Sequence, residues 1–293
     1  MNRLRLIVAF LLLCLLAGTA LGAESKKAFM LAAFGTSTEA SVTFDEMVPL
    51  VKKAFPDRNV VIPYTSSIIR EKLNKDIADP AQKILSPAEM LARLKEQGYT
   101  DIAVASTIVF PGVEHQKLKQ AVKEFAAKNR DVKVTYLPPM LEIPALLKPV
   151  VNSLKESVAK DAFTVVVTHG TRQGHPVEKN YRALAKAVAE TYPNTVVASL
   201  EGLPSMEEAM KRVARQPLKE VRFVVFMFVA GDHAENDIAG EEEDSLFSQV
   251  KKMGKTPSIR YTETLAGTRF HSLGLDQGYR TLLLNHYKSN IDR

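Results

Sequence analysis

The sequence predicts an α/β protein of two similar doubly wound lobes, each with a parallel four-stranded sheet. Apolar runs rich in β-branched residues alternate with amphipathic runs, and continuously apolar strands are typical of parallel sheets covered on both faces. The apolar runs divide into four and four. They lie at 28–34, 59–63, 102–110, 132–137, 163–168, 195–200, 221–229 and 258–262.

The two halves also echo each other in sequence. Phe29–Ser37 resembles Val165–Arg172, and the third strand of each half leads into a glycine and then a histidine, His115 or His233. A duplication would explain both similarities. We therefore expect an N-terminal lobe at 24–145 and a C-terminal lobe at 146–293, with a ligand-binding cleft between them.

Several predicted helices begin at recognisable signals. A further helix follows Pro176, because apolar residues recur at helical spacing from Val177 to Val188. The capping-box spacing, in which a hydroxyl and a carboxylate satisfy free backbone donors, occurs at Thr43–Glu46, Ser86–Glu89 and Ser205–Glu208.

Residues 1–23 are typical of a signal peptide. Two arginines precede the apolar run Leu6–Leu16, and small residues then favour cleavage between about positions 20 and 23. A membrane anchor needs about 18 or more apolar residues, so we expect a periplasmic protein without a stable anchor. The only cysteine, Cys14, lies in this leader, which excludes disulfides and thiolate metal ligands from the mature chain.

The remaining composition indicates a globular protein that binds a small molecule. About 270 residues with 46% apolar content suffice for a hydrophobic core. Loss of Arg3 and Arg5 lowers the formal charge from +6 to +4, a mild excess that suits an acidic ligand. Scattered basic residues and the absence of tryptophan argue against nucleic-acid binding. The sequence also lacks a GxGxxG motif and a Walker lysine, which argues against nucleotide binding.

Polar residues follow three successive strands of the second half. The first strand leads into His169-Gly, the second into Glu201-Gly and the third into Gly-Asp-His233. Because ligands of open parallel sheets bind beyond the carboxyl ends of the strands, we expect these three side chains to converge. Two imidazoles and a carboxylate can bind a divalent first-row metal ion and leave positions open for exchange.

These stretches resemble those of the sirohydrochlorin cobaltochelatases of anaerobic cobalamin biosynthesis. The similarity includes Val-Thr-His169-Gly-Thr, Leu-Glu201-Gly and the distinctive run from Gly231 to Gly240. It extends to Ala33–Ser37, to Pro63–Ser67 and to the segment 267–278, so that only the leader departs from the family pattern.

The resemblance implies a bilobal class II chelatase fold and the insertion of Co²⁺, or Fe²⁺, into a tetrapyrrole without ATP. It implies that His169, Glu201 and His233 bind the metal and perform catalysis, and it makes a homo-oligomer an expectation. A histidine or Glu201 can accept the pyrrole protons. For the carboxylates of sirohydrochlorin, the candidate binding residues by position are Thr36, Ser37, Arg172 and Arg269.

Two questions stay open at this stage. His115 follows Pro-Gly on what we expect to be a surface loop. It is a solvated histidine, an axial ligand for haem, or a ligand of a metal ion at a subunit interface. The leader also separates the protein from the cytoplasm, where cobalamin synthesis is expected. A periplasmic carrier of haem, another tetrapyrrole or metal is therefore an alternative to the enzyme, as is a metal-binding receptor of an uptake system.

Overall fold

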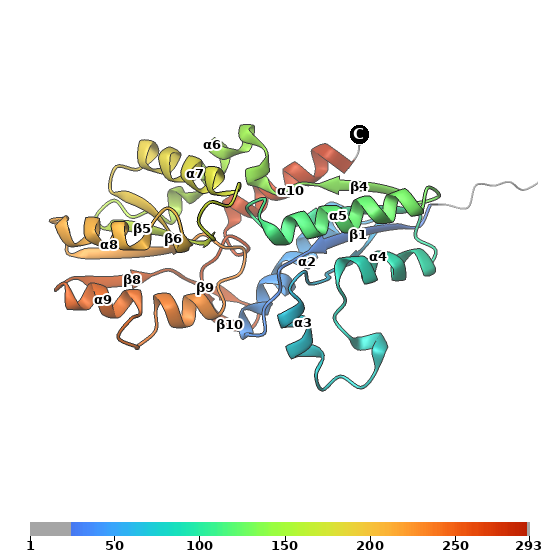
Figure 1. Cartoon of the computed structure of the whole chain (residues 1–293), viewed down its shortest axis with the longest axis horizontal. Coiled ribbons are helices and arrows are strands. Elements are labelled where there is room, and N and C mark those ends of the chain that lie inside the picture. The colour runs from blue at the N-terminus through green and yellow to red at the C-terminus, as the bar shows by residue number, and fades with distance from the viewer. Residues whose placement is uncertain (1–24, 292–293) are drawn as a thin grey trace, which may run out of the picture.

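A computed structural model gives the fold, and it describes residues 25–291 (Figure 1). Two four-stranded parallel sheets lie along the long axis of the molecule, each flanked by helices, which confirms the predicted class. The strand orders are β2-β1-β3-β4 and β6-β5-β7-β8. The strands are β1 (Lys27–Ala32), β2 (Arg58–Val61), β3 (Asp101–Ser106), β4 (Lys133–Leu137), β5 (Phe163–Thr171), β6 (Thr195–Gly202), β7 (Glu220–Val225) and β8 (Thr256–Ile259).

Helices cover both faces of each sheet. They are α2 (Val42–Ala54), α3 (Ser67–Asn74), α4 (Pro87–Glu96), α5 (Val113–Lys128), α6 (Leu147–Ser153), α7 (Glu178–Thr191), α8 (Met206–Arg215), α9 (Leu246–Lys252) and α10 (Gln277–Ile291). Short 3₁₀ turns occur at Glu39–Ser41, Pro80–Gln82, Met140–Glu142, Pro144–Leu146 and Leu154–Glu156. A π-helical segment, His233–Ile238, follows β7 and bears on the functional site.

Helices are present at all four predicted positions, and side chains cap two of the three that carry the capping-box spacing. Ser86 and Glu89 form a reciprocal capping box at α4, and the Ser205 hydroxyl accepts a hydrogen bond from the Glu208 amide at α8. At Thr43 the predicted helix is present, since α2 begins at Val42, but the predicted capping box is not formed. A 3₁₀ turn leads directly into α2, and the Thr43 side chain is buried in the first turn of that helix.

An antiparallel hairpin was not predicted. It consists of β9 (Tyr261–Thr264) and β10 (Gly267–Phe270), and it follows the second sheet. The predicted strand at 258–262 is divided between β8 and β9. The hairpin is largely exposed, so its sequence lacks the apolar run that identifies the eight sheet strands.

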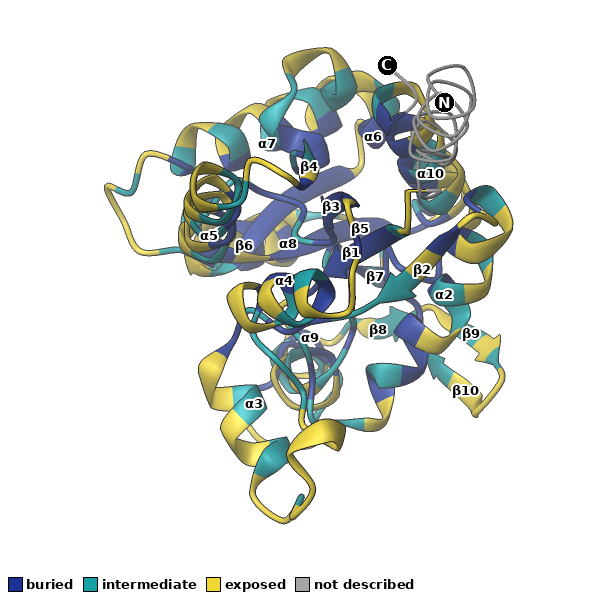
Figure 2. Ribbon diagram, turned by 90° about the vertical axis from the view of Figure 1, so that its right-hand side faces the viewer, coloured by how far each residue is buried: buried dark blue, intermediate teal, exposed yellow. Residues whose placement is uncertain are grey.

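The two lobes share one hydrophobic core, which joins Phe29 of β1 to Val166 of β5. Helix α10 contributes to this core by crossing back to the first lobe. Its Tyr287 ring lies 5.4 Å from the ring of Phe29, and the Tyr287 hydroxyl donates to the Ser106 carbonyl over 3.3 Å. Figure 2 shows the buried strands of both sheets and α10 beside α6. The predicted boundary at 145/146 thus separates the two sheets correctly, but α10 lies after this boundary in the sequence and packs against the first lobe.

The predicted signal peptide lies outside the described residues. Between residues 25 and 291, no helix is both long and apolar enough to span a bilayer.

Candidate metal site

The structure brings two of the three predicted metal ligands together. His169 lies near the end of β5 and His233 begins the π-helical segment after β7. Their ring centroids are 5.1 Å apart, and the rings meet edge to face at 78°. His169 is exposed, and 41% of the His233 side chain is accessible. Two imidazoles therefore face solvent next to each other at the carboxyl edge of the second sheet.

Hydrogen bonds fix which ring nitrogen each histidine offers. His233 Nδ1 lies 2.6 Å from Asp237 Oδ2, and His169 Nδ1 lies 3.3 Å from the Gly170 carbonyl oxygen. A carboxylate and a carbonyl oxygen only accept hydrogen bonds, so each Nδ1 carries the proton. The lone pair on each Nε2 is left for a metal ion, as in the carboxylate–histidine–metal arrangement of many metalloproteins.

Glu201 lies at the neighbouring strand end but on the other face of the sheet. It is in register with Gly170, the residue after His169, and successive residues of a strand point to opposite faces. Val166 shares a core with Tyr181 of α7, whereas Val167 shares one with Ala234 of the π-helical segment. Glu201 thus lies toward α7, and His169 lies toward His233.

The pKa of the Tyr181 hydroxyl agrees with this placement. Burial raises that pKa, and the nearby negative charge of Glu201 raises it further, against the hydrogen bond to the Gly170 carbonyl. Within residues 25–291, no group of three or more His, Cys, Asp or Glu side chains lies close enough to hold a metal ion. The role of Glu201 as a third ligand stays a prediction.

Gly170 allows the two strand ends to approach closely. Its φ is +87°, and a methyl carbon placed on it would lie 1.9 Å from the Glu201 carbonyl oxygen. Any side chain would clash there and would also disfavour this left-handed conformation. The backbone between His169 and Glu201 therefore depends on glycine.

Acidic side chains surround the histidine pair. Asp232, Glu235 and Asp237 are exposed on or next to the π-helical segment. Partial burial raises the pKa of Glu235, and the negative charges of Asp232 and Glu39 raise it further, while Arg269 opposes them. This concentration of negative charge attracts divalent cations to the site.

The four predicted carboxylate-binding residues differ in availability. Thr36 is buried and its hydroxyl bonds within its own loop, while Ser37 is half-buried. Arg269 pairs with Glu39 over 2.7 Å. Arg172 is exposed, and within residues 25–291 it has no ion pair. Arg172 is therefore the most accessible of these cations for a substrate carboxylate.

His115 does not lie on a surface loop, contrary to the prediction. Helix α5 begins directly after Gly112, and its third residue, His115, is completely buried. Nδ1 lies 2.8 Å from the Tyr136 hydroxyl, and Nε2 lies 2.8 Å from Glu142 Oε2. Burial lowers the pKa of His115, although the Glu142 charge acts in the opposite direction. The haem role stays a prediction, and it would require one ring nitrogen to leave its partner.

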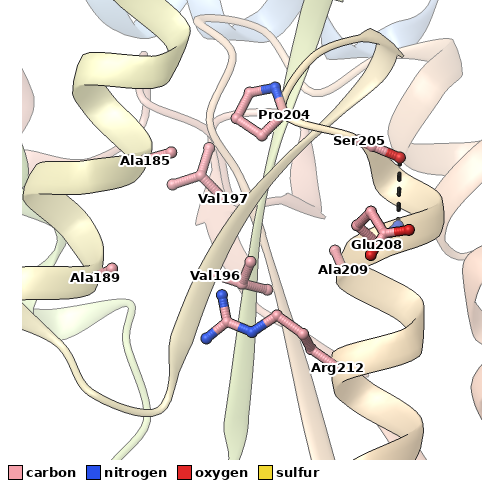
Figure 3. A pocket seen from close by; sticks show the side chains of 9 residues that line it. All are labelled: Ala185, Ala189, Val196, Val197, Pro204, Ser205, Glu208, Ala209 and Arg212. Carbon is pink, nitrogen blue, oxygen red and sulfur yellow. Dashed lines mark hydrogen bonds between the residues drawn. The ribbon is translucent and has the colours of Figure 1, made fainter.

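A hollow of about 200 Å³ lies elsewhere, between α7 and α8 over β6 (Figure 3). None of the candidate site residues lines it. The lining residues are Ala185, Ala189, Val196, Val197, Pro204, Ser205, Glu208, Ala209 and Arg212. It is thus distinct from the cleft that the sequence predicts between the lobes.

Comparison with known proteins identifies the family. The model of the cobalt chelatase family (CbiK) matches residues 27–292. The chain belongs to this cobalt chelatase family. Among similar proteins, a sirohydrochlorin cobaltochelatase of Nitratidesulfovibrio vulgaris is 27% identical over 91% of this chain and 91% of its own length. That of Salmonella typhimurium is 27% identical over 89% of this chain and 95% of its own. The resemblance noted in the sequence is confirmed.

Solved structures agree with the chelatase fold. SirB from Bacillus subtilis with Fe³⁺ superimposes with a TM-score of 0.59 at 14% identity, covering 91% of this chain and 96% of its own. CbiX, described as the terminal enzyme of sirohaem biosynthesis in denitrifying bacteria, gives 0.52 at 12% identity, covering 90% and 99%. At these identities the likeness concerns the fold alone.

Sequence reasoning missed Asp237. It lies four residues after His233, a spacing that brings side chains together on one face of a helix. The signal was therefore available within the run from Gly231 to Gly240, but it depended on recognising a helical segment there.

Proposed function

We propose that the protein inserts Co²⁺ into sirohydrochlorin without ATP, and that His169 and His233 present the metal ion. Membership of the cobalt chelatase family and two relatives with this activity in their names support the reaction. Within the molecule, the main support is the pair of solvent-accessible imidazoles, whose ring centroids are 5.1 Å apart and whose Nδ1 atoms each lie beside a hydrogen-bond acceptor.

Such a pair suits a metal that must be passed on. Neutral imidazoles replace part of the hydration shell of a divalent ion and leave other positions open for the ring nitrogens of the macrocycle. The affinity of imidazole for first-row metals extends to Fe²⁺, so Fe²⁺ is a second candidate substrate.

Glu201 is the candidate proton acceptor and third metal ligand. Metallation releases two pyrrole protons, and an exposed carboxylate near the metal can accept them. Glu201 is exposed, and within residues 25–291 it has no ion pair. Because it lies on the α7 face, binding the same ion as the histidines would require its side chain to reach around the strand end.

The substrate carboxylates require cationic or hydroxyl groups around the site. Arg172 can bind one directly, because it is exposed two residues after Gly170. Arg269 would have to exchange Glu39 for the substrate. In the first lobe, Ser37 offers a half-buried hydroxyl, whereas Thr36 would have to release its hydroxyl from the hydrogen bonds with Thr38.

We assign the protein to the periplasm on the basis of the leader in residues 1–23. No observation on the described residues favours the haem, tetrapyrrole or metal carrier over the chelatase. The assembly of the chain into a homo-oligomer belongs to the same set of proposals.

A metallation assay tests the assignment. Purified protein is mixed with Co²⁺ and metal-free sirohydrochlorin, and the absorbance change is compared with the spontaneous reaction. We expect His233→Ala and His169→Ala to lower kcat/KM by about a hundredfold or more, since losing an outer partner of a metal ligand already costs about 10–100-fold. His175→Ala, which alters a half-buried histidine six residues after His169 in the sequence and outside the pair, is the matched control.

Glu201→Gln separates the two roles of that carboxylate. A lower kcat with unchanged Co²⁺ binding would indicate a proton acceptor, whereas lost Co²⁺ binding would indicate a ligand. A wild-type rate equal to the spontaneous rate would refute the proposed activity.

A further inference from the structure

Large apolar side chains are exposed at a few places in the described residues. Six are exposed between residues 25 and 291, and three of these follow successive strands of the first lobe. Phe34 follows β1 with 48% exposure, Ile68 is the second residue of α3 after β2 with 75%, and Val113 begins α5 after β3 with 51%. Single exposed apolar residues are common, but three at one sheet edge call for a reason.

We call Ile68, Phe34 and Val113 the apolar edge. They follow the neighbouring strands β2, β1 and β3, whose carboxyl ends lie at one edge of the first sheet. A backbone hydrogen bond from the Ser66 amide to the Phe34 carbonyl, 3.2 Å long, ties the start of α3 to the end of β1. The two apolar side chains are thus held on connected segments.

The backbone keeps Phe34 outside the core. Ala33 before it is buried, and Gly35 after it has φ +97°. A methyl carbon on Gly35 would lie 2.4 Å from the Tyr64 ring, so only glycine fits this turn. The exposure of Phe34 follows from an ordered turn between packed residues.

The loops that carry the apolar edge contact the loops that carry the histidine pair. A methyl carbon on Gly231, two residues before His233, would lie 3.0 Å from Thr36 Oγ1. The Phe110 ring, in the loop before Val113, stacks on Tyr181 with centroids 3.8 Å apart. The Tyr181 hydroxyl in turn donates to the Gly170 carbonyl next to His169. The two strand edges therefore adjoin.

We infer that Ile68, Phe34 and Val113 bind one face of the tetrapyrrole, opposite the face that receives the metal from His169 and His233. This inference rests on the proposed function and names the surface that holds its substrate. A tetrapyrrole has a flat ring system with a charged rim, and its ring faces gain from contact with apolar and aromatic side chains.

The contrast in chemistry between the two edges supports this arrangement. Apolar side chains do not compete for the metal ion, and they do not repel the carboxylates on the rim. The histidine edge, with its acidic neighbours, attracts the cation. Macrocycle binding and metal binding should therefore respond to different substitutions.

Binding of metal-free sirohydrochlorin, followed by its fluorescence without cobalt, tests the inference in the full-length protein. We expect Phe34→Ala to raise Kd about tenfold, and the triple variant F34A/I68A/V113A to raise it further, as expected when a ligand buries less apolar surface. Phe34→Leu should recover part of the affinity. Co²⁺ binding, titrated separately, should stay within about twofold of wild type.

Leu265→Ala is the matched control, because Leu265 is an equally apolar, exposed residue on the hairpin tip. It should leave Kd unchanged, and unchanged thermal midpoints show that the variants are folded. An unaltered Kd in the triple variant, or an equal loss in Leu265→Ala, would overturn the inference while wild-type metallation persists. If the wild type neither binds nor metallates sirohydrochlorin, the proposed function fails together with the inference.

Discussion

The two lobes place a histidine after the third strand of their sheets, and the two histidines have opposite environments. His115 is in a regular α-helix and is completely buried between Tyr136 and Glu142. His233 begins a π-helical segment and is partly exposed beside His169. The histidine after the third strand thus belongs to the packed interior in the first lobe, whereas in the second lobe it offers a ring nitrogen to an external ligand.

The difference shows that an imidazole can bind an external ligand only if its second ring nitrogen has no partner within the protein. Both ring nitrogens of His115 have protein partners, so its chemistry is satisfied within the fold. Among residues 25–291, only Nδ1 of His233 has a partner, Asp237, and Nε2 is left for an external ligand. Changing these partners in turn tests the comparison.

The largest expected effect is on stability, from His115→Ala. The substitution leaves a cavity and removes the partner of the Tyr136 hydroxyl, so the free energy of unfolding should fall by about 3 kcal/mol. Urea unfolding measures this change, with the m-value unchanged. Metallation per folded molecule should stay at the wild-type rate. Lost metallation with intact stability would mean that His115 has a functional role.

A smaller effect is expected from Asp237→Ala. Without the carboxylate, His233 loses its fixed tautomer and orientation, and the Kd for Co²⁺ should rise about 10–100-fold. Calorimetric titration with Co²⁺ measures the change, and Asp237→Asn should have an intermediate Kd because its amide oxygen can still accept from Nδ1. Asp232→Ala is the control, since Asp232 bonds Asn236 and not the histidine. Equal losses in both variants would indicate a general charge effect.

The smallest effect concerns pH. Burial lowers the pKa of His115 below its usual 6.5, so the unfolded chain binds this proton more readily than the folded protein. Neutral His115 contributes to the free energy of unfolding above about pH 6.5, and this contribution is lost as the pH falls through the folded-state pKa. The free energy of unfolding should therefore change with pH, through this group, by no more than about 1.4 kcal/mol per pH unit. Unfolding between pH 7.5 and 5 measures it, and His115→Gln should flatten the curve; an unchanged slope would assign the dependence to other groups.

Most of the fold could be predicted from the sequence. The eight sheet strands were found because parallel strands buried on both faces carry continuous β-branched runs. The β9–β10 hairpin lacks such a run. The place of α10 depends on contacts between segments far apart in the chain, such as Tyr287 with Phe29, and no local pattern encodes those contacts.

The candidate site could be predicted only in part. Strand-end position brought His169 and His233 to one edge, but the face to which Glu201 points depends on the pairing register of β5 and β6, which the sequence alone does not specify. The burial of His115 likewise depends on Tyr136 and Glu142, which lie 21 and 27 positions further along the chain.

Helix α10 also affects the order in which the protein can fold. The first sheet cannot complete its core until residues 277–291 have been synthesised, because they pack against β1 and follow every strand of both sheets. Such long-range closure slows folding. The α10 face of the first lobe should therefore become compact only after the last helix of the chain is available, so a truncation before residue 277 would leave that face of β1 without its cover.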